Sequence, residues 1–259
     1  MTLFQSILIA LVEGLTEFLP ISSTGHMILA STAMGIHEDE FVKTFEVFIQ
    51  LGAILAIALM YIKRFFRSLT IYFKLITAFL PTAVVGFLAY DYIKAYLFNP
   101  IVVSVSLILG GIILIFIDKK VAAQGSTVVE VEDISYKNAF FIGLCQCLSM
   151  VPGTSRAAAT IIGGVFNGLD KRQATEFSFL LAVPTMLAAG GYDLLKADLA
   201  FTSEQLMLLG IGFVVAFASA WGAVKLFLTY VSTHGFTAFG WYRIGLGILF
   251  LILMWGADL

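Results

Sequence analysis

The sequence predicts an all-α polytopic membrane protein with about six transmembrane helices and two re-entrant helix hairpins. Of its 259 residues, 60% are hydrophobic and 12% are charged, and a soluble domain of this length would carry about twice that charge. The apolar runs are long and continuous rather than alternating, which favours helices over a β-barrel. Two of these runs are interrupted by a proline among polar residues, as in broken membrane helices.

The elements follow in an order that hydropathy and proline define. Residues 3–34 are too polar in their middle for a simple span and fit two short helices around Pro20. Residues 138–167 form a second such segment, broken at Pro152 and Gly153. Six other runs approach the ~20 residues that cross a bilayer as a helix: 45–62, 75–90, 101–117, 175–192, 205–225 and 239–255. The predicted organisation is a single membrane domain, 1–259, with halves of about 1–117 and 138–259 joined by the hydrophilic loop 118–137.

The two interrupted segments resemble each other. LPISST at 19–24 aligns with VPGTSR at 151–156, and each is followed about 25 residues later by a helix with an early glutamate, Glu46 or Glu176. Three crossings separate the segments, so the halves would enter the membrane from opposite faces as inverted repeats. A broken backbone is tolerated at that depth only where protein or a water-filled cavity covers it. We therefore expect the two segments to meet.

The distribution of charge predicts the orientation. If both interrupted segments return to their own side, Lys43, Lys94 and Lys196 face one side and Arg156 lies within the membrane. The other basic residues then share the opposite side, which the positive-inside rule makes cytoplasmic: Lys63, Arg64, Arg67, Lys74, Lys119, Lys120, Lys137, Lys171, Arg172, Lys225 and Arg243. Both termini are then expected outside the cytoplasm. The net charge of −2 predicts no nucleic-acid partner, whereas the apolar runs predict membrane lipids around the chain.

The first interrupted segment carries groups suited to a metal and to acid–base chemistry. Glu13 and Glu17 lie four residues apart, on one face of a helix, and paired carboxylates suit Mg²⁺ or Ca²⁺. Pro20 ends this helix. A second helix can start in the polar run that follows, presenting free N–H groups and hydroxyls: Ser22, Ser23 and Thr24. His26, one turn further on, is a candidate base or nucleophile.

The second interrupted segment supplies the complementary charge. It carries Arg156 beside the hydroxyls of Thr154, Ser155 and Thr160. A guanidinium fork matches phosphate oxygens bidentately, and helix N-termini bind anions. Together the segments predict a membrane-embedded phosphate and metal site. Four further polar residues are expected around it in supporting positions: Glu46, Gln50, Gln146 and Glu176.

Other interpretations stay open at this point. Arg156 and a glutamate could form a purely structural ion pair, and His26 could be an ordinary buried histidine. Glu46 and Glu176 could equally be charges at helix N-termini. Inverted repeats and broken helices are typical of transporters, so a lipid flippase is the rival function. A structural subunit ranks third, because it has no need of an intramembrane arginine.

Four sequence runs carry a resemblance: EGLTEFLPISSTGH at 13–26, KTFEVFIQLGAILA at 43–56, PGTSRAAAT at 152–160 and EFSFLLAVP at 176–184. They resemble the bacterial undecaprenyl-diphosphate phosphatase family, also called the bacitracin-resistance proteins. The order of segments is similar over essentially the whole chain. One position departs from the family pattern, because Ala157 stands where a serine usually follows the arginine.

The resemblance implies the residues and the reaction. The family's phosphate-binding motif falls on 152–160 and so includes Gly153, and the implied catalytic residues are Glu17, Ser23, His26 and Arg156. The implied reaction is hydrolysis of undecaprenyl diphosphate to the monophosphate and inorganic phosphate, on the outer (periplasmic) face of the bacterial plasma membrane. This recycles the lipid carrier of cell-wall synthesis. The resemblance also implies a divalent cation and interdigitated inverted repeats, and it leaves open both a homodimer and the attacking atom, Ser23, His26 or water.

Overall fold

The structure is a computed structural model that describes residues 1–259 except 68, 98, 122–130, 197–199 and 257–259. The described chain is helical, and six of its helices, α3, α5, α6, α9, α10 and α11, are long and apolar enough to cross a membrane. The predicted all-α polytopic class is therefore confirmed. In chain order the elements are α1 (Leu3–Thr16), α2 (Ser23–Ala33), α3 (Glu40–Met60), α4 (Ile62–Arg67), α5 (Leu69–Tyr96), α6 (Pro100–Val121), η1 (Val131–Asp133), α7 (Tyr136–Cys147), η2 (Leu148–Met150), α8 (Arg156–Phe166), α9 (Lys171–Lys196), α10 (Ser203–His234) and α11 (Thr237–Gly256).

Both predicted interruptions are present. The chain leaves helical structure between α1 and α2, around Pro20, and again between η2 and α8, around Pro152. Several crossing helices extend beyond the predicted spans, and α10 is the clearest case. A capping box at Thr202 starts α10, and Gly235, with φ of +76°, follows its last residue. Hydropathy marks only the apolar part of such a helix, whereas its caps set the ends.

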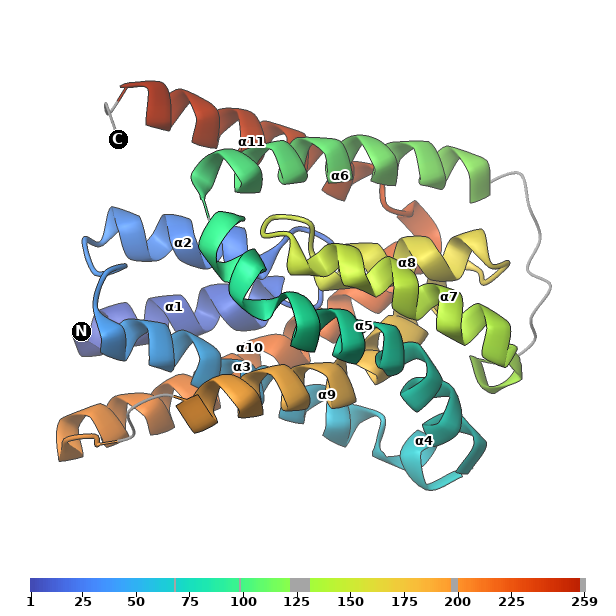
Figure 1. The fold of residues 1–259 in the computed structure, drawn as a ribbon, viewed down its shortest axis with the longest axis horizontal. Helices are drawn as coiled ribbons and strands as arrows, with labels where there is room; N and C mark the ends of the chain where they lie inside the picture. The colour runs from blue at the N-terminus through green and yellow to red at the C-terminus, as the bar shows by residue number, and fades with distance from the viewer. Residues whose placement is uncertain (68, 98, 122–130, 197–199, 257–259) are drawn as a thin grey trace.

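The helices of the two predicted halves are exchanged (Figure 1). α1 packs along α10, and α7 packs along α5, so the first helix of each interrupted segment lies against a long helix of the other half. Glycine permits both approaches, because a Cβ on Gly14 would overlap the carbonyl oxygen of Ala216 and one on Gly143 would overlap that of Ala78. This exchange is what interdigitated repeats would produce. The inverted topology and the division into halves stay predictions, and part of the predicted loop, 122–130, lies outside the described residues.

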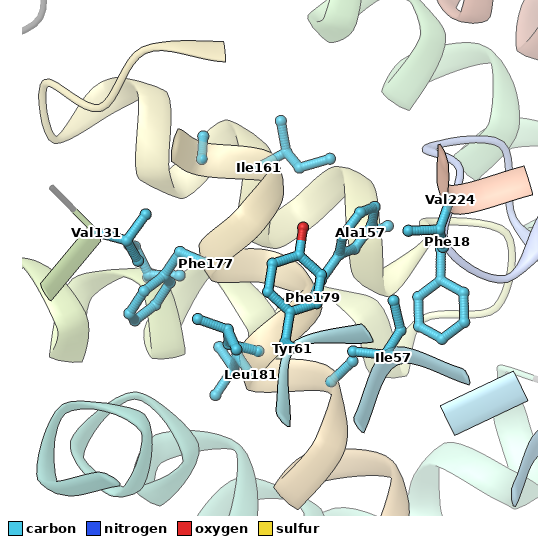
Figure 2. Close-up of a cluster of buried hydrophobic side chains, with 14 of the residues drawn as sticks. Phe18, Ile57, Tyr61, Val131, Ala157, Ile161, Phe177, Phe179, Leu181 and Val224 are labelled. Atoms are coloured by element: carbon cyan, nitrogen blue, oxygen red, sulfur yellow. The ribbon is translucent and has the colours of Figure 1, made fainter. Parts of the chain in front are cut away.

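An aromatic cluster in the core holds the first interrupted segment in place (Figure 2). The ring of Phe179, on α9, has its centroid 5.6 Å from that of Phe18, 6.4 Å from that of Tyr61 and 6.2 Å from that of Phe227. Phe18 and Phe179 are completely buried. Because Phe18 follows Glu17 directly in the chain, this packing sets where the Glu17 carboxylate lies.

Candidate active site

In each interrupted segment the chain turns sharply at a serine directly before the second helix, and we call these two turns the corners. Ser22 precedes α2 and its hydroxyl accepts a hydrogen bond from the Gly25 N–H at 3.4 Å, while Ser155 precedes α8 and accepts from the Ala158 N–H at 3.2 Å. Both serines have left-handed backbones, with φ of 70° and 71°, and among the described residues no other non-glycine residue has a positive φ. Such a conformation costs on the order of 1–3 kcal/mol and clusters at functional sites. The predicted helix start in the run from Ser22 to Thr24 is confirmed, and the structure adds the matching start at Ser155.

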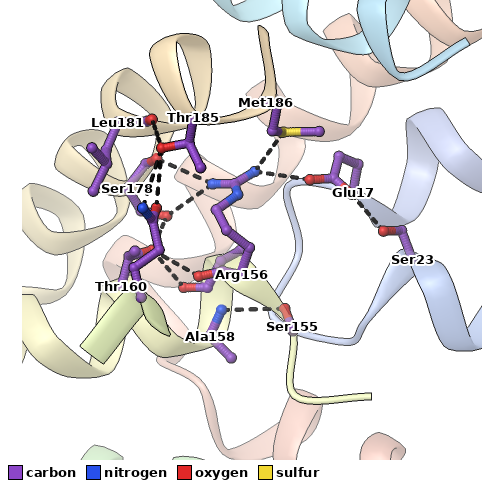
Figure 3. Close-up of polar contacts among 12 residues, drawn as sticks. Glu17, Ser23, Ser155, Arg156, Ala158, Thr160, Ser178, Leu181, Thr185 and Met186 are labelled. Carbon is purple, nitrogen blue, oxygen red and sulfur yellow. Dashed lines mark hydrogen bonds and ion pairs between the residues drawn. The ribbon is translucent and has the colours of Figure 1, made fainter. Parts of the chain in front are cut away.

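The charged groups of the two segments meet at Glu17 (Figure 3). Arg156 Nη2 donates to Glu17 Oε1 at 3.0 Å, and the Ser23 hydroxyl donates to the other oxygen, Oε2. Arg156 Nη1 donates to the Ser178 carbonyl oxygen at 3.1 Å, and its guanidinium carbon lies 5.5 Å from the centroid of the Phe18 ring. Glu17 therefore links a serine of its own segment to the arginine of the other, and the prediction that the segments meet is confirmed.

Arg243 ties the two interruptions together from α11. Its side chain is completely buried, and every donor nitrogen faces backbone carbonyl oxygens. The acceptors, with their distances, belong to Pro20 (3.0 Å), Gly153 (2.9 Å), Thr154 (2.9 Å), Ser106 (3.1 Å) and Leu107 (3.3 Å). An interrupted helix leaves carbonyl oxygens without partners, and a guanidinium offers five N–H donors. One arginine therefore donates to carbonyl oxygens at both breaks.

The sequence-based placement of Arg243 among the cytoplasmic loop cations is therefore wrong. The loop-charge rule assigns cations to loops, whereas this arginine lies inside the predicted span 239–255. Its position inside a predicted span could have identified Arg243 as a site residue, because an ionisable residue inside a span is by default functional or paired. Gly110 is a second sign, since a Cβ there would overlap the Arg243 guanidinium.

The hydrogen bonds of His26 go to Ser22 and Tyr242. Its Nδ1 lies 2.8 Å from the Ser22 carbonyl oxygen, and its Nε2 lies 2.7 Å from the hydroxyl of Tyr242. The Ser23 hydroxyl is bonded to Glu17 instead. Tyr242 carries no signal in the sequence, because a tyrosine in an apolar helix is unremarkable until its neighbour across the fold is known.

The remaining predicted phosphate-binding residues line the two corners. Thr24 is half-buried in the first turn of α2. Gly153 has φ of +87°, and a Cβ there would overlap the backbone of Val103, so glycine is required. The Thr160 hydroxyl contacts the Ser178 hydroxyl at 2.6 Å and the Arg156 carbonyl oxygen at 2.9 Å. Thr160 thus lies beneath Arg156 and helps to hold its turn of helix.

The four expected supporting residues lie in three different surroundings. Glu46 lies on α3 with Gln50 one turn further on, and α3 packs against α1, the helix that carries Glu13. Gln146 is completely buried and donates to the hydroxyls of two threonines that hold neighbouring helices, Thr82 at 2.9 Å and Thr185 at 3.2 Å.

Glu176 belongs elsewhere. It accepts from Arg64 at 3.0 Å and from Arg172 at 3.2 Å, and Arg64 also donates to Glu132 at 2.9 Å. Its carboxylate is therefore part of an ion-pair cluster joining α4, η1 and α9, and it is separate from the Glu17–Arg156 pair. The equivalence of Glu46 and Glu176 in sequence does not extend to their contacts.

Glu13 is the residue whose surroundings suit a cation. It is completely buried, and among the described residues neither of its carboxylate oxygens has a hydrogen-bond partner. A buried carboxylate without partners is costly, and a divalent ion would relieve that cost. Within the described residues no three acidic, histidine or cysteine side chains converge as a metal cage. Mg²⁺ is commonly held by one or two carboxylates plus substrate phosphate oxygens, so the residues present fit the predicted ion.

The comparisons with known proteins identify the family of the chain. The family described as Bacitracin resistance protein BacA matches residues 6–249. Curated relatives named undecaprenyl-diphosphatase include one from Wolinella succinogenes, 50% identical over 98% of this chain and 99% of its own length. Others come from Bdellovibrio bacteriovorus, 48% identical over 100% and 99%, and from Aquifex aeolicus, 46% identical over 96% and 98%. The chain belongs to the bacitracin resistance protein BacA family.

Proposed function

We propose that this chain hydrolyses undecaprenyl diphosphate to undecaprenyl phosphate and inorganic phosphate. Curated relatives that match it over nearly their whole length are named undecaprenyl-diphosphatase. The structural observation that carries the proposal is Glu17, which accepts from both Ser23 and Arg156. A nucleophile, a proton acceptor and a phosphate-binding cation thereby adjoin one another, as phosphoryl transfer requires.

The second segment binds the phosphate in this mechanism. Arg156 and the N–H groups at the start of α8 hold oxygens of the terminal phosphate, where the positive end of the helix dipole favours an anion. Ser155 holds that start in its left-handed corner. Arg243, through the carbonyl oxygens of both interruptions, keeps the two corners in register.

Ser23 attacks the terminal phosphorus. Its Oγ forms a bond to phosphorus, the bond from phosphorus to the bridging oxygen breaks, and undecaprenyl phosphate leaves. Glu17 accepts the Ser23 proton, because its Oε2 is the hydrogen-bond partner of that hydroxyl. Water then hydrolyses the phosphoserine and releases inorganic phosphate. His26, bonded to Tyr242 rather than to Ser23, serves as a base that takes a proton from the attacking water.

A divalent cation is part of the proposal. Glu13 would hold it, with Glu17 beside it, because the Glu13 oxygens are buried without partners. Such an ion, Mg²⁺ or Ca²⁺, neutralises charge on phosphate oxygens.

The membrane arrangement is proposed on the same grounds. The two segments enter from opposite faces of the bacterial plasma membrane, with the site open to the periplasmic side. The exchange of helices between the halves and the shared left-handed serine backbone support the repeat. The distribution of basic loop residues supports the orientation. A homodimer stays a prediction of the family resemblance.

The rival function is lipid transport, and one experiment separates the two. Purified protein in detergent is given a C55 lipid diphosphate with Mg²⁺, with Ca²⁺, or with EDTA, and released phosphate is measured. Detergent micelles have no two sides, so metal-dependent release supports a hydrolase. Absence of release by folded protein with metal present would reject the proposed function. Ser232→Ala, a change at an exposed hydroxyl, serves as the control and should release phosphate at the wild-type rate.

A further inference from the structure

The hydrogen bonds around His26 define which of its nitrogens is basic. The Ser22 carbonyl oxygen can only accept, so Nδ1, at 2.8 Å, carries the hydrogen. In a neutral imidazole the other nitrogen then has the lone pair. Nε2, at 2.7 Å from the Tyr242 hydroxyl, therefore accepts from that hydroxyl. Any proton that His26 takes up must arrive at Nε2, after the Tyr242 hydroxyl hydrogen has turned away from that lone pair.

Tyr242 can serve both protonation states of this ring. Its hydroxyl donates to Nε2 when His26 is neutral, and by rotating about the C–O bond its oxygen accepts from Nε2–H when His26 is charged. The two rings lie parallel, with an interplanar angle of 5° and centroids 5.6 Å apart. Hydrogen bonds at both nitrogens therefore leave the imidazole little freedom to turn.

We infer that Tyr242 is a positioning residue for the reaction, holding His26 with Nε2 as its basic nitrogen. The inference rests on the proposed phosphatase function, in which His26 acts as a base. Without the hydroxyl the imidazole can rotate, and the tautomer with the hydrogen on Nε2 competes with the productive one. The position is set by α11, since the next residue, Arg243, anchors that helix to both interruptions.

The chain offers a matched pair for comparison. Tyr230 stacks on His234, with centroids 4.7 Å apart and an interplanar angle of 12°. There the histidine Nδ1 contacts the neighbouring Thr233 hydroxyl at 2.7 Å. Stacking is common to both pairs, whereas the bond from a tyrosine hydroxyl across 216 residues of sequence belongs to the His26 pair. Tyr230→Phe is therefore the control for removing a stacked tyrosine hydroxyl.

The kinetic test compares Tyr242→Phe with Tyr230→Phe in the C55 diphosphate assay. Tyr242→Phe should lower kcat on the order of 10- to 100-fold, as for other partners that orient a functional histidine, while KM changes less than about 3-fold. Tyr230→Phe should match the wild type. In a His26→Ala background, Tyr242→Phe should lower kcat by less than about 2-fold, because Tyr242 acts through His26. A wild-type kcat for Tyr242→Phe, or a full additional loss in the His26→Ala background, would overturn the inference.

A second readout does not depend on turnover. Nitrogen NMR of protein labelled at its three histidines reports which ring nitrogen carries the hydrogen, and His26→Ala identifies the signal. The wild type should show His26 protonated at Nδ1, and Tyr242→Phe should shift the Nε2 resonance while Tyr230→Phe leaves it in place. An unmoved Nε2 resonance would overturn the inference even if the enzyme is active. Failure of the wild type to release phosphate would instead reject the proposed function and leave this measurement valid.

Discussion

Arg156 Nη2 and Glu17 Oε1 lie 3.0 Å apart although 139 residues separate them in the chain. Both side chains are about nine-tenths buried. A buried charge that loses its partner costs several kcal/mol, so each interrupted segment depends on the other for a stable charge state. The pair thereby couples the assembly of the fold to the assembly of the site.

Replacing Arg156 tests its role toward phosphate. Arg156→Lys keeps the charge but loses the planar fork that matches phosphate oxygens. We expect phosphate release to fall on the order of 100-fold or more, the size of effect seen when one transition-state donor is removed. Arg172→Lys, at a side chain that is 68% exposed, should retain wild-type activity. Near-normal turnover in Arg156→Lys would remove Arg156 from the site.

Replacing Ser23 separates the covalent route from direct attack by water. Ser23→Ala removes the hydroxyl that donates to Glu17, and release should fall to the background rate if serine is the nucleophile. Rapid acid quenching of the wild type should then trap a phosphoserine at Ser23. A loss of only a few-fold in Ser23→Ala, with no trapped intermediate, would assign the attack to water.

Glu13→Gln tests the metal. The amide keeps the shape of the carboxylate but binds a hard cation weakly, so the concentration of Mg²⁺ or Ca²⁺ for half-maximal release should rise about 10-fold or more. Stabilisation of the fold by the metal, measured as a rise in melting temperature with added ion, should decrease in parallel. Glu204→Gln, in the first turn of α10, is the control. Unchanged metal dependence in both measurements would place the ion elsewhere.

Arg243→Lys tests the link between the two interruptions. Lysine has three donors on one nitrogen in place of a five-donor fork, and an unsatisfied buried carbonyl costs about 1–3 kcal/mol. We expect the free energy of unfolding to fall by roughly 3 kcal/mol or more, visible as a lower melting temperature in detergent. A melting temperature equal to the wild type would show that the five carbonyl oxygens do not depend on the guanidinium.

Replacing Gly143 tests the close contact of α7 with α5. A Cβ at Gly143 would overlap the Ala78 carbonyl oxygen, so Gly143→Ala should separate the helices and lower the melting temperature. Within the part of the chain that the structure describes, a Cβ added at Gly222, on α10, would meet no atom within 4 Å outside its own helical turn. Gly222→Ala should therefore stabilise slightly, by up to about 1 kcal/mol from helix propensity. Equal effects of the two variants would contradict the packing described here.

Local chemistry explains why much could be read from the residues alone. Apolar runs near the length of a bilayer predict crossing helices. Prolines among polar residues predict the two breaks, and the run from Ser22 to Thr24 predicts a helix start. The acidic side chains of the first segment and Arg156 of the second are expected to meet, because unpaired charges inside a membrane are too costly to retain. These predictions depend on neighbours in sequence or on the cost of burial, and neither needs a fold to evaluate.

The sequence by itself therefore determined the class of the protein, its interrupted segments and the charges that meet. Only the tertiary structure decided the partners of these side chains. Ser23 donates to Glu17, and His26 is hydrogen-bonded to Tyr242. Glu176 belongs to a separate ion-pair cluster, and Arg243 donates to carbonyl oxygens of both breaks. The physical reason is that a side chain's hydrogen-bonding capacity is local, whereas the group that satisfies it comes from whichever helix packing brings near. Arg243 shows this most clearly, since its acceptors are backbone atoms that carry no signature in the sequence.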